Sequence, residues 1–237
     1  MSSPIDLHPQ TDPRLSTGLG GLFYGVHPAL VTDLADPQGQ GRIRVKLPWA
    51  TDGGNGYEAW MRMATLFAGA DRGAWFMPDV GDEVLVAFGG GNTRHGYVIG
   101  GLWNGTDTPH EDMDSGSSND IKSLRTRNGV KVTLDDTSGA EQMILETPGG
   151  QSITLRDSAA GIALEDSNGN TVTMEAAGIS VDASAKVSIS ASQIEVSAGL
   201  VTVDAGMSKF SGVVKADTVI SNSVDKASNT PGAGNIW

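Results

Sequence analysis

The residue types that most often carry chemistry are few in this chain, and their spacing matches no catalytic motif. There is no cysteine, which excludes thiolate catalysis and metal sites built on sulfur. The four histidines lie outside any H-E-x-x-H zinc motif and any nucleophile elbow: His8, His27, His95 and His110. The Gly-rich segment 89–92 lacks the Gly-Lys-Ser/Thr that completes a phosphate-binding loop, so a hairpin turn is the better interpretation.

The acidic run PHEDMD at 109–114 contains residue types that ligate metals. His110, Glu111, Asp112 and Asp114 could bind a cation, but such runs are more often a solvated surface, and we expect no metal here. Asp135 and Asp136 are adjacent, so in a strand they would face opposite sides and make a poor acid–base pair. We therefore predict no catalytic residue, no cofactor and no enzyme activity.

Composition argues against a nucleic-acid-binding protein. The net charge is −12 over 237 residues, whereas binding to a phosphate backbone normally needs a basic face. No run of 18 apolar residues is present, and residues 1–10 lack the charged and apolar regions of a secretory signal. These features lead us to expect a protein made in the cytoplasm without a signal peptide.

The elements that would position functional side chains differ between the two halves of the chain. Eleven of the thirteen Phe, Trp and Tyr residues precede position 110, and the polar stretch 105–120 separates them from the remainder. Only the first half can build a compact core around large side chains. The predicted parts are an N-terminal arm (1–19), a barrel domain (20–106), a linker or exposed loop (107–120), a repeat domain (121–228) and a C-terminal tip (229–237).

The first half has the pattern of a small β-barrel. Residues 42–49 alternate apolar and basic side chains, and Gly-rich turns separate them from four further candidate strands at 21–34, 59–64, 83–88 and 95–103. Five short strands with such turns are typical of a closed barrel. Segment 64–75 is expected to be a short helix or a loop that plugs one end of the barrel.

Short motifs occur in a fixed order within residues 20–106. They are a D-P-x-G-x-G-R turn, a basic strand ending in P-W, a P-x-x-G-D-E-V segment and a closing N-G. The matching positions are Asp36, Pro37, Gly39, Gly41, Arg42, Pro48, Trp49, Pro78, Gly81, Asp82, Glu83, Val84, Asn104 and Gly105. This order resembles the OB-fold domain of contractile-tail spike proteins, which include phage baseplate protein V and the valine-glycine-repeat (VgrG) proteins of type VI secretion.

The second half is a strand-and-turn repeat with a thin core. From 153 onward, apolar pairs begin 9, 10, 7, 8, 7 and 7 residues apart. Burying two aliphatic side chains per repeat stabilises by about 3–6 kcal/mol, whereas ordering seven residues costs roughly 7–14 kcal/mol of backbone entropy. Several chains wound together would remove this deficit, with each strand pairing at its edges with strands of neighbouring chains. The predicted shared core is Ile153, Leu155, Ile162, Leu164, Val172, Met174, Ile179, Val181, Val187, Ile189, Ile194, Val196, Val201 and Val203.

The resemblance implies that this assembly is a homotrimer. The fold class expected is therefore all-β, with an OB-fold barrel followed by an intertwined trimeric β-prism or β-helix. The pairs Asn-Gly in RNGV (127–130) and SNGN (167–170) are additional hairpin signals.

The same resemblance implies a mechanical function, as the central spike of a phage tail baseplate or a phage-derived injection system. Its implied partners are tube-end or hub baseplate proteins, and a target membrane only on firing. Asn235, Ile236 and Trp237 would form an apolar tip that closes the prism, docks a PAAR-like tip protein, or both. Two alternatives are a glycan-binding or glycan-cleaving β-helical tail protein and an OB module for single-stranded nucleic acid. The scarcity of aromatics in the repeat opposes the former, and the acidic charge opposes the latter.

Overall fold

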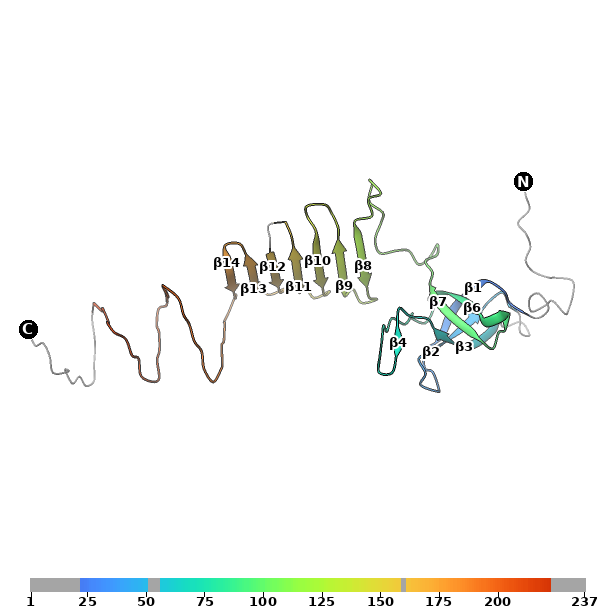
Figure 1. The fold of residues 1–237 in the computed structure, drawn as a ribbon, viewed down its shortest axis with the longest axis horizontal. Helices are drawn as coiled ribbons and strands as arrows, with labels where there is room; N and C mark the ends of the chain where they lie inside the picture. The colour runs from blue at the N-terminus through green and yellow to red at the C-terminus, as the bar shows by residue number, and fades with distance from the viewer. Residues whose placement is uncertain (1–21, 51–55, 159–160, 223–237) are drawn as a thin grey trace, which may run out of the picture. The chain divides into compact units, whose positions relative to one another are not determined.

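The computed structural model describes residues 22–50, 56–158 and 161–222. Throughout these ranges the protein is all-β, as predicted, and the one helical turn described is the 3-10 helix η2 (Gly89–Gly91). A closed barrel is followed along the chain by a seven-stranded sheet (Figure 1). None of the described residues belongs to a helix with the length and apolarity that a bilayer span requires.

Five strands close the barrel in the order β1-β2-β3-β7-β6. Their bounds are β1 Val26–Asp33, β2 Arg42–Leu47, β3 Tyr57–Met63, β6 Glu83–Phe88 and β7 Gly96–Gly101. All neighbours are antiparallel except β3 and β7, which pair in parallel. The inward positions form one buried core, which consists of Ala29, Val31, Ile43, Val45, Leu47, Met61, Val84, Val86, Phe88 and Val98. The five-stranded barrel is the architecture that the sequence predicts, and it is consistent with an OB fold.

Segment 64–75 contains no helix, so that part of the expectation is wrong. It contains a small hairpin instead, in which β4 (Ala68–Gly69) pairs with β5 (Arg72–Gly73). Asp71 turns the chain with a φ of 52°, and Gly73 adopts a φ of 155°. These backbone angles suit a tight reversal, and a helical turn would require neither of them.

The seven-stranded sheet is an antiparallel meander in which every strand pairs with its neighbours along the chain. Its strands are β8 Ile121–Arg125, β9 Lys131–Asp135, β10 Gln142–Glu146, β11 Ser152–Arg156, β12 Gly161–Glu165, β13 Thr171–Glu175 and β14 Gly178–Asp182. The expectation that these strands pair mainly with neighbouring chains is therefore wrong for residues 121–182. Only the outer edges of β8 and β14 lack a strand partner within the sheet.

Three turns of identical construction explain this pairing within one chain. In 126–130, 147–151 and 166–170, the first residue's N–H donates to the last residue's carbonyl, and a glycine at the fourth position donates back to the first carbonyl. Those glycines have φ values of 80° to 90°, which favour glycine. The last residue's N–H also donates to the side-chain oxygen of Thr126, Thr147 or Asp166. Two of the three turns contain the Asn-Gly pairs that the sequence indicates as hairpins.

The chain divides into two units, residues 1–185 and 186–237. In the second unit the described residues end at 222, and no strand is assigned between 183 and 222. Among the described residues, no strand forms a ladder with this segment.

Candidate functional site: ordered turns and two apolar surfaces

The ordered motifs in the barrel build turns and do not bring reactive groups together. The Asp36 carboxylate accepts hydrogen bonds from the backbone N–H groups of Gln38, Gln40 and Arg42 at 3.0, 2.8 and 3.2 Å. It also pairs with the Arg42 guanidinium at 2.6 Å, and the Asp36 side chain is only 5% exposed. The Arg42 contact, followed by the backbone donors, holds the pKa of Asp36 well below its usual range. Gly39 and Gly41 supply the positive φ angles of 61° and 67° that this turn requires.

The remaining barrel motifs tie loops to strands in the same way. Gly81 donates its N–H to the Val31 carbonyl at 2.9 Å, and the Asp82 side chain accepts from the N–H of Asp79 at 2.7 Å. Asn104 donates its side-chain amide to Glu83 at 2.9 Å. Pro48, Pro78 and Gly105 lie at the ends of these turns and strands. These contacts tie the loops that carry Gly81, Asp82 and Asn104 to the barrel strands.

Trp49, the last residue of the P-W motif, lies in an aromatic cluster with His27. Its indole Nε1 donates to the Pro28 carbonyl at 3.1 Å, and its ring centroid is 4.7 Å from that of His27. Phe23 and Phe88 complete the cluster. Burial lowers the pKa of His27, so its neutral form is favoured among these rings. This histidine packs among the aromatic rings next to the barrel core.

Part of the polar stretch before the sheet is held against β8 and β9 by side chains. Glu111 accepts from Lys131 at 2.6 Å and from the Ser123 hydroxyl at 3.1 Å, and His110 is 2.7 Å from that hydroxyl. Lys131, followed by Ser123, lowers the pKa of Glu111. Asp114 accepts from the N–H groups of Ser118 and Asn119. The acidic residues thus bind their own chain, and the described ranges contain no cluster of three or more His, Asp or Glu that could hold a metal ion.

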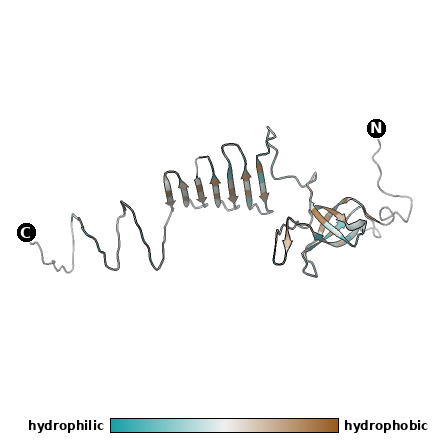
Figure 2. Ribbon diagram, viewed as in Figure 1, coloured by the Kyte–Doolittle hydropathy of each residue, from teal (hydrophilic) through white to brown (hydrophobic). Residues whose placement is uncertain are grey.

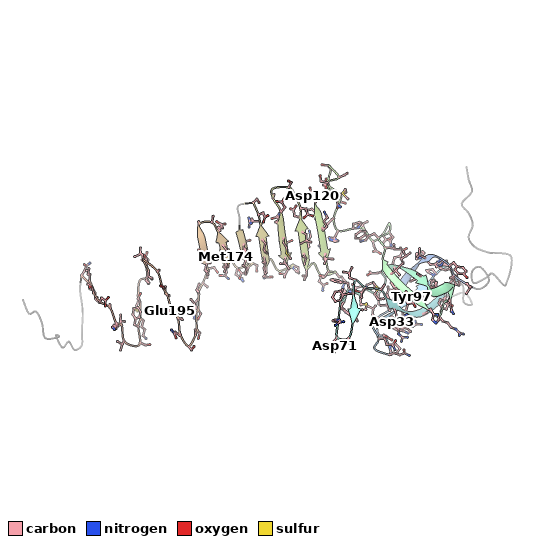
Figure 3. The ribbon with its side chains drawn as sticks, in the orientation of Figure 1. Asp33, Asp71, Tyr97, Asp120, Met174 and Glu195 are labelled. Carbon is pink, nitrogen blue, oxygen red and sulfur yellow. The ribbon has the colours of Figure 1, made fainter. Side chains whose placement is uncertain are left out.

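The two faces of the seven-stranded sheet differ sharply in polarity. On one face each strand contributes two side chains, and the cross-strand pairing aligns them into two columns. One column is Leu124, Val132, Leu145, Ile153, Leu164, Val172 and Val181, and the other is Lys122, Leu134, Met143, Leu155, Ile162, Met174 and Ile179. We call this surface the apolar face. Figure 2 shows the alternation of hydropathy along the strands, and Met174 is labelled in Figure 3.

The opposite face carries mostly small, polar and charged side chains. Its middle row is Ser123, Thr133, Ile144, Thr154, Ala163, Thr173 and Ser180, in which Ile144 is the one large apolar residue, and several charged residues flank that row. The polarity of the two faces therefore identifies the apolar face as the one that needs a covering partner.

A single copy does not cover the apolar face. Leu134 is 46% exposed, Val181 is 56% exposed and Ile179 is 70% exposed. One column is apolar on all seven strands and the other on six, since Lys122 occupies it on β8. Water-exposed apolar columns of this length are unusual for a protein that acts as a monomer, and such patches mark interfaces. Of the predicted core residues, all those from Ile153 to Val181 lie on this face.

The remaining predicted core residues lie in the extended segment 183–222. Val187, Ile189, Ile194, Val196, Val201 and Val203 are all at least 56% exposed in a single copy. Backbone groups in extended chain without a ladder must bond elsewhere when they are buried. In a single copy these apolar side chains are therefore left in contact with water. The predicted tip residues, Asn235 to Trp237, lie outside the described residues.

Sequence reasoning missed one exposed apolar group on the barrel. Leu66, Phe67, Trp75 and Phe76 flank the β4–β5 hairpin and are 59% to 90% exposed. The signal was present in the segment LFAGADRGAWF, whose aromatic residues bracket a Gly-rich turn.

Comparison with known families assigns both halves. Residues 27–103 match the Type VI secretion system/phage-baseplate injector OB domain, and residues 142–207 match the phage baseplate V C-terminal trimerisation domain. The first match coincides with the closed barrel. The second covers the sheet from β10 onward and part of the extended segment, and it supports a homotrimer.

The curated relatives are spike proteins of low identity. The type VI secretion system spike protein VgrG3 of Vibrio cholerae is 25% identical over 49% of this chain and 13% of its own length. VgrG1c of Pseudomonas aeruginosa is 26% identical over 49% of this chain and 17% of its length. The actin cross-linking toxin VgrG1 of Vibrio cholerae is 24% identical over 60% of this chain and 13% of its length. The chain thus matches well under a quarter of each of these relatives.

An injector OB barrel followed by a trimerisation domain defines a class of protein, the spikes of contractile injection machines. The chain belongs to the contractile-tail spike family, which comprises phage baseplate protein V and the VgrG-like spikes. Spike proteins of this family are parts of an assembled secretion or phage injection particle.

Proposed function

We propose that this protein is the central spike of a contractile injection machine, either a phage tail baseplate or a phage-derived injection system. The barrel caps the distal end of the inner tube, where it contacts tube-end or hub baseplate proteins. The sheet and the extended segment of three chains form an outward rod that pierces the target membrane when the sheath contracts. The observation that carries this proposal is the apolar face, which is followed along the chain by a segment in which no strand is assigned up to residue 222, where the described residues end.

The geometry of the sheet suits a load-bearing rod. Neighbouring strands in a sheet lie about 4.8 Å apart, so the seven strands extend for roughly 29 Å along the direction in which they are stacked. The backbone hydrogen bonds between strands lie along that direction, and every strand contributes several of them. A load applied along the row passes from one ladder to the next, and within each ladder several hydrogen bonds share it. The energy for piercing comes from the sheath, so this function needs no catalytic residue.

A functional test compares two substitutions at adjacent positions in a cell that makes the machine. Deleting the gene for this chain should abolish delivery, and the unaltered gene should restore it. Ser180→Asp, on the polar face of β14, should also restore delivery, whereas Val181→Asp, on the apolar face of the same strand, should not. If the deletion leaves delivery intact, the chain is not the spike of that machine.

The proposed tip contact has its own test. Residues 229–237 include the apolar pair Ile236 and Trp237, which fits docking of a PAAR-like tip protein. Deleting these residues should leave three chains associated but should remove the tip protein from a pull-down. Retention of the tip protein by the shortened chain would refute the docking idea and leave the spike assignment untouched.

A further inference from the structure

The β4–β5 hairpin presents an aromatic surface that its own barrel does not bury. Phe67 is 59% exposed, Phe76 is 66% exposed and Trp75 is 72% exposed, and Leu66 beside them is 90% exposed. Asp71, labelled in Figure 3, lies at the tip of the hairpin. A dense group of large apolar side chains around one exposed turn usually contacts another surface. We call this group the hairpin knob.

The hairpin knob is held in place by its own hydrogen bonds. The Thr65 hydroxyl donates to the Ala74 carbonyl at 2.6 Å, and the Ala74 N–H donates to the Phe67 carbonyl at 3.1 Å. An open groove of about 630 Å³ is lined by the knob and by the turn 39–41, and the Trp75 ring lies close to Gly41 in that turn. The knob therefore offers a preformed surface with a concave side, and binding to it orders few additional side chains.

A second apolar surface lies elsewhere on the barrel wall. Val26, Pro28 and Leu30 occupy the outward positions of β1, where they alternate with the buried Ala29 and Val31. Val26 is 54% exposed and Leu30 is 39% exposed. We call these three outward residues the β1 stripe.

The hairpin knob and the β1 stripe face different neighbours around the barrel. The knob extends from the end of β3, whose ladder partners are β2 and β7, whereas β1 pairs with β2 and β6. Because Val26 and Leu30 remain exposed in a single copy, a barrel does not cover its own stripe with its own knob.

Three barrels tied together by the trimerisation domain provide an occupant for both surfaces. A tether of this kind raises the effective concentration of each barrel near its neighbours to about the millimolar range. A contact between two different patches is heterologous, and repeated around a threefold axis it closes into a ring. The homotrimer supplies that axis.

We propose that the hairpin knob of each copy packs on the β1 stripe of the next copy, which closes the three barrels into a ring. This inference rests on the homotrimer and goes beyond the spike function, because the family match places trimerisation at residues 142–207 and not in the barrel. The ring buries both apolar patches without any other protein. It also makes the cap over the tube a single rigid body in place of three independently tethered barrels.

The absence of native cysteine allows a direct test by cross-linking of the full chain. Phe67→Cys and Val26→Cys are introduced together, since both positions are exposed and neither contributes to the barrel core. The purified protein is treated with a short bifunctional maleimide and separated on a denaturing gel. The matched control carries Phe67→Cys together with Ile99→Cys in place of Val26→Cys. Ile99 lies on β7 and is 44% exposed.

In the Phe67/Val26 variant alone, the band of the single chain should disappear and a band with the mass of three linked chains should replace it. Native mass measurements before treatment establish that both variants are trimers. If the trimer is intact and the Phe67/Val26 pair stays unlinked, or is linked only within one chain, the ring is refuted while the spike assignment stands. If the knob instead binds a hub protein, the purified trimer likewise shows no cross-link between chains at the Phe67/Val26 pair.

Discussion

Val181→Asp tests whether other chains cover the apolar face. Val181 is 56% exposed in one copy, so association can bury about half of its side chain, which corresponds to about 1 kcal/mol. Three copies contribute about 3 kcal/mol, or about a hundred-fold in the association constant. The introduced carboxylates would in addition lie unpaired in a shared interior, which costs several kcal/mol more. The variant should therefore dissociate at concentrations where the unaltered protein is fully trimeric.

The assay is native mass by light scattering over a dilution series. Ser180→Asp is the matched control, because it adds the same charge to the adjacent residue on the opposite face, and Ser180 is also exposed in one copy. The control should keep the mass of three chains across the series. Equal behaviour of the two variants, either both trimeric or both dissociated, would refute the assignment of the apolar face as the interior of the trimer.

Three further predictions concern the barrel and the segment before the sheet. Because the folded-state pKa of Asp36 is depressed below its ordinary value of 3.8, its interaction should stabilise the barrel fully above about pH 4 and be lost as the pH falls further. Asp36→Asn should lower the thermal midpoint at pH 7, and the two midpoints should converge in acid; a constant difference down to pH 2 would show that the charge is not responsible. Glu111→Gln removes the ion pair with Lys131 and should speed proteolysis within residues 112–118 without changing the native mass; unchanged cleavage would mean that the contact does not hold the segment. Gly96→Ala should destabilise the barrel by about 1–3 kcal/mol, since its Cβ would approach a buried methionine within 2.5 Å, while Gly100→Ala on the same strand meets nothing within 4 Å and serves as the control in thermal melts.

The barrel could be predicted from sequence because its strands bury one face strictly. Ile43, Val45 and Leu47 alternate with basic residues, and all three are at most 1% exposed. The strand ends at Leu47 because Pro48 follows, two residues before the predicted bound. The β4–β5 hairpin was not predictable in this way, since its strands are two residues long and contain glycine.

The pairing of the repeat could be predicted only in part. The alternation in Ile153 to Val181 identifies strands and one common face, but it does not say which strand lies beside which. That choice depends on the turns. Five-residue turns such as 166–170 contain a glycine at positive φ and return the chain beside itself, and alternation does not reveal their hydrogen bonds. The side-chain contacts of Glu111 were likewise invisible, because the partner Lys131 lies 20 residues further on.

The turns of the meander have a consequence for the order of assembly. Closing a strand against its immediate neighbour spans few residues and has a small entropic cost, so residues 121–182 can pair as soon as one chain is made. Segment 183–222 forms no described strand in one chain, so under the proposed function it orders only when three chains associate. Three preformed sheets would associate first and fix how the three chains are aligned along their common axis. The segments that follow could then pair residue by residue, without one chain having to pass through a loop of another. Refolding should accordingly begin with a phase whose rate is independent of chain concentration and end with one that depends on it.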